Sequence, residues 1–163
     1  MEWTEDFESG LADIDVQHRY IFALIKRIVD LQGRTMSSDD RDVLEEIARF
    51  AHCHFACEER LMAAYNYPDS SKHVTEHAKL VLELKKYQES ETIDSRTLSL
   101  FLCNWIVAHT LLEDRQLAAH VLRVRAAIMG TSVSEFMANV VTTYRASTIK
   151  VASEAPTSNR VDD

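Results

Sequence analysis

Two pairs of side chains that can bind metal stand close together in the middle of the chain. His54 and Glu58 form one pair, and His73 and His77 form the other, each with a spacing of four residues. On an α-helix, residues four apart lie on one face, one turn from each other. A turn at residues 65–69 would fold two such helices antiparallel and bring all four side chains together. The spacing therefore predicts a metal site between two helices.

Apolar residues at alternating spacings of three and four indicate the helices that must position this site. The inward stripes read Ile14, His18, Ile21, Ile25 and Ile28; Leu44, Ile47, Ala51, His54, Glu58, Leu61 and Tyr65; His73, His77, Leu80, Leu84 and Tyr87; and Leu98, Leu102, Trp105, His109 and Leu112. Gly33, the 65–69 turn and residues 92–95 separate the stripes. Four long helices with short connections predict an all-α, up-down-up-down four-helix bundle.

The two ends of the chain lack this pattern. Residues 1–12 have no helical period and predict an irregular N-terminal arm. Ser132–Glu135 resembles a capping box before a shorter apolar segment, which predicts a short extra C-terminal helix. From about residue 153 the chain is small and polar, as in a tail without a core. We therefore expect the bundle at residues 1–130, and a C-terminal helix and polar tail at residues 131–163.

Composition narrows the classes of function. The net charge of −8 argues against a nucleic acid or an anionic membrane as partner. The sequence has no long apolar run and no basic leader at its start, and its odd count of 3 Cys fits a reducing compartment. We therefore expect a cytoplasmic protein, and only 3 Gly and 2 Pro in 163 residues agree with long helices.

Every predicted stripe contains at least one metal-capable residue in phase with its apolar neighbours. The set comprises His18, His54, Glu58, His73, His77 and His109. Burying five imidazoles and a carboxylate without a cation would leave many polar groups unpaired. Nitrogen and oxygen donors disfavour iron–sulfur clusters and Cys-type zinc sites, and five imidazoles are too many for Ca²⁺ or Mg²⁺. A pair of iron ions fits best, with zinc and manganese left open, and no His follows a Glu by three residues as in ferritin-like bundles.

This pattern resembles the hemerythrin family, and its bacterial members in particular. The resemblance covers about residues 1–120 and includes the spacing between Trp105, His109 and Asp114. The other matching residues are Trp3, Phe7, Gly10, Ile14, Asp15, Gln17, His18, His54, Phe55, Glu58, Glu59, Leu61, Met62, Tyr67, Pro68, His73 and His77. Residues 131–163 lie outside the resemblance.

The resemblance implies two non-heme iron ions with an oxide or hydroxide bridge. It assigns His73, His77 and His109 to one iron, His18 and His54 to the other, and Glu58 and Asp114 to both as bridges. His109 and Asp114 are five residues apart, about 140° around an ideal helix, so Glu113 would be better placed on helix geometry alone. The family spacing favours Asp114. This ligand set leaves one coordination position open, on the iron with two imidazoles.

One open position favours reversible O₂ binding for carriage, storage or delivery, by a protein that is not an enzyme. Trp105 and Ile106 are candidates for the apolar wall of the O₂ pocket, although ordinary core packing would explain them equally well. A sensor of O₂ or redox state that signals through residues 131–163 is the alternative, and a di-iron oxidase or reductase is the least favoured. We expect a monomer, with residues 131–163 available to a protein partner.

Overall fold

The computed structural model describes residues 2–130 and residue 135. Its contacts divide the chain into two units, Met1–Arg123 and Val124–Asp163. In the second unit the described residues, 124–130 and 135, are helical. Apart from residue 135, the predicted C-terminal helix and polar tail lie outside the described residues, so the division at residue 130 stays a prediction.

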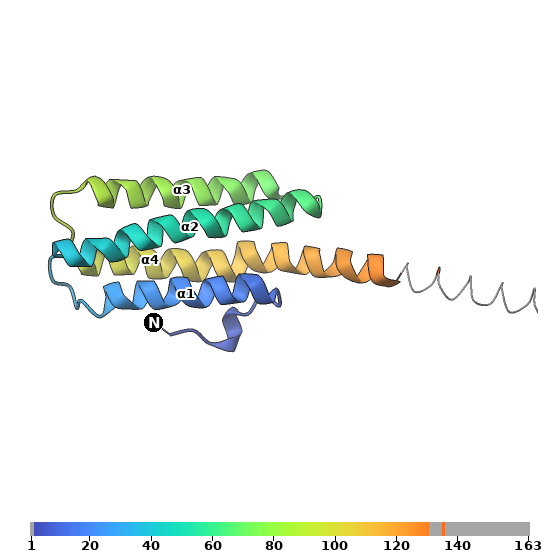
Figure 1. Ribbon diagram of the computed structural model, residues 1–163, viewed down its shortest axis with the longest axis horizontal. Coiled ribbons are helices and arrows are strands. Elements are labelled where there is room, and N and C mark those ends of the chain that lie inside the picture. The colour runs from blue at the N-terminus through green and yellow to red at the C-terminus, as the bar shows by residue number, and fades with distance from the viewer. Residues whose placement is uncertain (1, 131–134, 136–163) are drawn as a thin grey trace, which may run out of the picture. The chain divides into compact units, whose positions relative to one another are not determined.

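The first unit contains the predicted four-helix bundle (Figure 1). Its helices are α1 (Ala12–Val29), α2 (Ser38–Ala64), α3 (Ser70–Glu89) and α4 (Ser95–His109). Helix α1 contacts α2 and α4, and α2 also contacts α3. The all-α, up-down-up-down prediction is confirmed.

Side chains at the helix ends explain where the helices begin. Ser37 and Asp40 form a capping box before α2, and the Asp94 carboxylate accepts the backbone N–H groups of Arg96 and Thr97 before α4. Helix α1 ends at Val29, four residues before the predicted stop at Gly33. The intervening residues form a tight turn in which Gly33 has a φ of 82°, a conformation that suits glycine.

A π-helical turn, Thr110–Asp114, interrupts the helix that continues from α4, and residues 115–130 are again α-helical. Its wider i→i+5 turn shifts the phase of the residues that follow His109. Leu112, which the sequence pattern placed on the inward stripe, is therefore 57% exposed. Asp114 faces inward in its place, with 1% exposed.

Two apolar clusters fill the bundle, and a polar layer separates them. The larger cluster includes Ile25, Ile47 and Ile106, and the smaller one includes Met62 and Leu117. Along α2 the order is Ile47, His54, Glu58, Met62, and along the fourth helix it is Ile106, His109, Asp114, Leu117. The helices therefore carry the predicted metal ligands between two apolar layers.

The N-terminal arm is irregular apart from a short 3₁₀ turn at Glu5–Phe7. The rings of Trp3 and Phe7 pack against Phe22 of α1, with ring centroids 5.1 and 4.7 Å away. The buried Asp15 carboxylate accepts hydrogen bonds from the Ser9 and Gly10 backbone N–H groups at 2.7 and 3.2 Å. These contacts hold the arm beside the α1 turn that carries His18.

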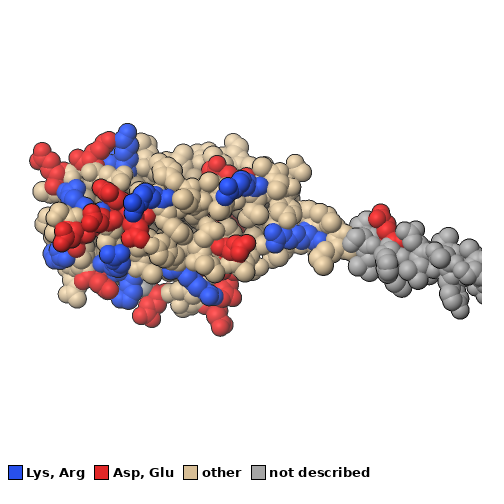
Figure 2. Space-filling model, viewed as in Figure 1, with Lys and Arg blue, Asp and Glu red and all other residues tan. Residues whose placement is uncertain are grey.

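The surface of the bundle mixes both signs of charge. Lys, Arg, Asp and Glu side chains are interspersed on the face in view and gather most densely at one end of the bundle (Figure 2). Among the described residues, no helix combines the length and apolar character needed to cross a membrane.

Candidate metal centre

All seven residues predicted as metal ligands meet in the polar layer. They come from α1 (His18), α2 (His54, Glu58), α3 (His73, His77), α4 (His109) and the π-helical turn (Asp114). None of them is more than 4% exposed. As the four-residue spacings predicted, the pair on α2 and the pair on α3 face each other.

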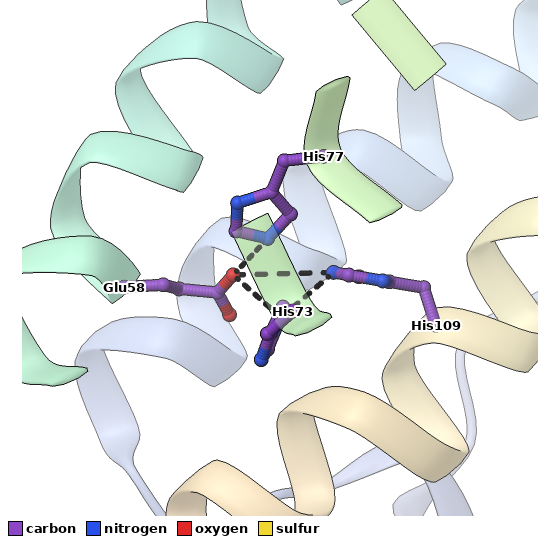
Figure 3. A group of neighbouring side chains, drawn as sticks. All are labelled: Glu58, His73, His77 and His109. Atoms are coloured by element: carbon purple, nitrogen blue, oxygen red, sulfur yellow. Dashed lines mark hydrogen bonds and ion pairs between the residues drawn. The ribbon is translucent and has the colours of Figure 1, made fainter. Parts of the chain in front are cut away.

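The first group of ligand atoms gathers around one oxygen of Glu58. Atoms of Glu58, His73, His77 and His109 lie within 4.8 Å of one another. Glu58 Oε2 is 3.0 Å from His77 Nε2, 3.6 Å from His73 Nε2 and 4.0 Å from His109 Nε2. Figure 3 shows these side chains pointing toward one another from three helices. Three imidazoles and a carboxylate oxygen thus surround one point.

The second group gathers beside the first. Atoms of His18, His54, Glu58 and Asp114 also lie within 4.8 Å of one another. His18 Nε2 is 3.1 Å from Asp114 Oδ2, and His54 Nε2 is 3.5 Å from Glu58 Oε1. Glu58 therefore turns one oxygen toward each group.

The two carboxylate oxygens of Asp114 also face different groups. Its Oδ2 lies near His18 of the second group, whereas its Oδ1 lies 3.1 Å from His73 Nε2 and 3.0 Å from His109 Nε2. Each carboxylate thus places one oxygen near each of the two groups. Glu113, the alternative suggested by ideal helix geometry, instead pairs with Lys72 Nζ at 2.9 Å.

The π-helical turn explains why Asp114 points inward and Glu113 does not. In an α-helix the residue five positions after His109 would lie well to one side of it. An i→i+5 turn brings that residue back over His109. Rare turns of this kind cluster at functional sites, where they redirect one side chain without breaking the helix.

Interactions between the buried carboxylates and imidazoles shift the pKa values in this layer. Burial alone would raise the pKa of Glu58 and Asp114, but the surrounding imidazoles hold both values below their usual range. Burial lowers the pKa of His109, yet Asp114 and Glu58 outweigh burial and raise it to about 10. Burial dominates at His54, whose pKa falls to about 4. The carboxylates are thus ionised and favour protons on His73 and His109, where a cation could replace those protons.

Several of these converging atoms lie within ion-pair distance of one another but form no hydrogen bond. No described residue offers a hydrogen-bond partner to His54 Nε2, His77 Nε2, either oxygen of Glu58 or either oxygen of Asp114. Leaving such buried groups unpaired is costly, and a cation at the middle of each group would satisfy them. Imidazole and carboxylate donors suit iron, zinc or manganese. The residues therefore fit a bound metal.

Two further side chains contact the outer nitrogens of these imidazoles. His54 Nδ1 lies 3.1 Å from Gln17 Oε1, and His77 Nδ1 lies 3.3 Å from Glu59 Oε1. A hydrogen bond donated by Nδ1 leaves Nε2 free to face the centre and fixes the ring orientation. Both residues match the family pattern in the sequence, but the spacing of the ligands predicts no role for them. Their one signal was their position, each directly beside a predicted ligand in the chain.

Aromatic rings support the imidazoles from the apolar side. Phe55 stacks on His77 with centroids 3.8 Å apart, and Trp105 stacks on His109 at 4.4 Å. Of the two predicted wall residues, Trp105 therefore borders the centre directly. Ile106 is fully buried in the larger apolar cluster, one turn before Thr110. Phe55 borders the centre in the same way, at a position that the sequence pattern did not predict for the wall.

A four-helix bundle with a buried layer of five imidazoles and two carboxylates defines a class of metal-binding helical protein. Comparison with known families identifies the class more closely. Residues 9–121 match the family described as the hemerythrin HHE cation binding domain. The chain therefore belongs to the hemerythrin family.

Individual relatives agree with this family. The chain is 28% identical over 123 residues to a bacteriohemerythrin of Stenotrophomonas maltophilia, which covers 73% of this chain and 80% of the relative. It is 32% identical over 110 residues to a hemerythrin-like protein of Naegleria gruberi, which covers 66% of this chain and 82% of the relative. A crystal structure of a hemerythrin mutant superposes with a TM-score of 0.67 at 26% identity, over 74% of this chain and 96% of that one.

Proposed function

We propose that this chain holds two iron ions and binds O₂ reversibly, for carriage, storage or delivery, without catalysing a reaction. The observation that carries the proposal is the pair of unequal ligand groups, one with three imidazoles and one with two, that share Glu58. A bacteriohemerythrin is among the relatives, which supports the same function.

In this proposal His73, His77 and His109 hold one iron, and His18 and His54 hold the other. Glu58 and Asp114 would each offer one oxygen to each iron, in keeping with the distances above, and an oxide or hydroxide from solvent would complete the ligand set. The two-imidazole group then has one coordination position left for a ligand. When bound, two ferrous ions supply the pair of electrons that O₂ can accept.

The chain's own residues make that exchange reversible by keeping water and reductants away. Every proposed ligand is buried, and apolar layers of side chains lie on both sides of the polar layer. Water exclusion strengthens the electrostatic interactions inside and hinders hydrolytic side reactions. The stacked rings of Phe55 and Trp105 resist rotation of the imidazoles they cover.

The test is an oxygenation cycle on the iron-loaded, chemically reduced protein. We expect uptake of one O₂ per two irons with a new visible absorption, and recovery of the reduced spectrum when O₂ is removed under inert gas. Hydrogen peroxide is assayed alongside. Stoichiometric peroxide release at the first exposure, with no recovery of the reduced spectrum, would contradict reversible binding and favour an oxidase or a redox sensor.

A further inference from the structure

One buried hydroxyl beside the centre has no partner. Thr110 opens the π-helical turn directly after His109, and it is 1% exposed. None of the described residues offers its Oγ1 a hydrogen bond. A Thr inside a helix commonly donates to the backbone carbonyl one turn earlier, and a buried hydroxyl without any partner destabilises the fold. Such a group needs an explanation.

The helix register places this hydroxyl on a particular side of the centre. In the wide turn each residue advances by about 80°, so Asp114 lies between His109 and Thr110 around the helix axis. His109 Nε2 faces α3, 3.3 Å from His73 Nε2, whereas Asp114 Oδ2 reaches toward His18 of α1. Thr110 therefore lies furthest toward α1, on the side of the two-imidazole group.

The level along the bundle is also defined. Thr110 is one turn closer to the larger apolar cluster than Asp114, as His54 is relative to Glu58 and His77 is relative to His73. The hydroxyl thus lies level with His54 and His77. The carboxylates of Glu58 and Asp114 come from one turn away, nearer the smaller apolar cluster. Ile106 lies one turn before Thr110, nearer the larger apolar cluster, and is fully buried and apolar.

We infer that the Thr110 hydroxyl donates a hydrogen bond to a small anionic ligand held at the two-imidazole side of the centre. This inference rests on the proposed function and deepens it, because it names a residue that selects the ligand. A hydrogen bond to a charged acceptor is stronger than one between neutral groups, and a buried donor needs little reorganisation. With Ile106 on its far side, Thr110 favours ligands that carry negative charge over neutral ones.

The experiment titrates the oxidised, iron-loaded protein with azide and follows the absorption change. Thr110→Val keeps the side-chain shape and removes the donor, so azide affinity should fall by about tenfold or more. Thr110→Ser keeps a hydroxyl and should restore most of the affinity. An unchanged dissociation constant in Thr110→Val would overturn the inference.

A matched control comes from the same helix. The Ser95 hydroxyl is also fully buried without a partner among the described residues, but it lies about 20 Å away along α4. Ser95→Ala should leave azide affinity unchanged. If it weakens azide as much as Thr110→Val does, the loss is a general packing effect and the inference is wrong.

A second readout needs no metal. Because the Thr110 hydroxyl has no protein partner, Thr110→Val should leave the thermal midpoint of the metal-free protein unchanged or raise it. A lowered midpoint would mean that the hydroxyl is bonded to the protein, which contradicts the inference. Wild-type protein that binds neither two irons nor azide would overturn the proposed function, whereas identical azide binding by wild type and Thr110→Val would overturn the inference alone.

Discussion

The two ligand groups of the centre share carboxylates, but they differ in the number of imidazoles and in the side chains that contact those imidazoles from outside. The group on α3 and α4 has three imidazoles, and one of them, His77, is oriented by the carboxylate of Glu59. The group on α1 and α2 has two imidazoles, and one of them, His54, is oriented by the amide of Gln17. One group is therefore richer in imidazoles than the other, and its outer acceptor is a carboxylate in place of an amide.

In the proposed function, this inequality would let one centre both hold metal and bind a ligand. A metal whose coordination positions are all filled by protein donors is retained but cannot bind a further ligand. A metal with an open position can bind one. Because both groups share Glu58 and Asp114, metal retention and ligand binding would depend on the same two carboxylates. The predictions below test whether the two groups differ as proposed.

The largest effect should come from removing one imidazole from the smaller group. His54→Ala leaves His18 as the only imidazole there, so we expect loss of the second iron and of O₂ binding. His77→Ala, the matched variant in the larger group, leaves two imidazoles and should cost less ligand binding. Iron analysis and O₂ titration measure both effects. Two irons and normal O₂ uptake in His54→Ala would refute the assignment.

A carboxylate shared by both groups should matter almost as much. Asp114→Ala removes an oxygen from each group and should reduce the loading of both irons. Glu113→Ala removes only the partly exposed pair with Lys72 and should change stability by about 1 kcal/mol or less. If Glu113→Ala proved the more damaging of the two, the bridging role would pass to Glu113.

The outer contacts should have a smaller effect. Glu59→Ala and Gln17→Ala each leave one imidazole without its orienting acceptor, and iron affinity should fall by about tenfold. We expect Glu59→Ala to have the greater effect, because a carboxylate makes the imidazole a stronger donor than an amide does. Competition with a chelator measures the affinities. Equal affinities in both variants and the wild type would show that these contacts do not tune the centre.

A further difference between the groups should appear in the pH dependence of the metal-free protein. The raised pKa of His109, about 10, adds stability that is complete below pH 6.5 and is lost as pH rises toward 10. The lowered pKa of His54, about 4, costs stability as pH falls from 6.5 toward 4. Imidazole signals in nuclear magnetic resonance report each titration. Two histidines that both titrate near pH 6.5 would contradict the difference between the groups.

Much of this arrangement could be predicted from the sequence, because helix periodicity determines which residues share a face. The stripes around Ile14, Leu44, Leu80 and Leu98 predicted the four helices, and the spacings of His54, Glu58, His73 and His77 predicted their convergence. The same periodicity fails where the helix is not ideal. It placed Leu112 inward, because no local pattern marks the π-helical turn.

Contacts between helices were also beyond reach of a single sequence. The interactions of Gln17 with His54 and of Glu59 with His77 depend on how helices are rotated against each other. The unpaired Thr110 hydroxyl likewise appears only once burial is known. Spacing predicts which side chains share a face, but not which atoms of neighbouring helices meet.

Diffraction from crystals of the iron-loaded protein, with anomalous data on either side of the iron absorption edge, tests the central claim most directly. We predict two iron peaks, one among Glu58, His73, His77 and His109 and one among His18, His54, Glu58 and Asp114. The second should have one position still open after its two imidazoles, its two carboxylates and the oxide or hydroxide bridge are counted. A single iron peak, or two irons with equal numbers of imidazoles, would contradict the account.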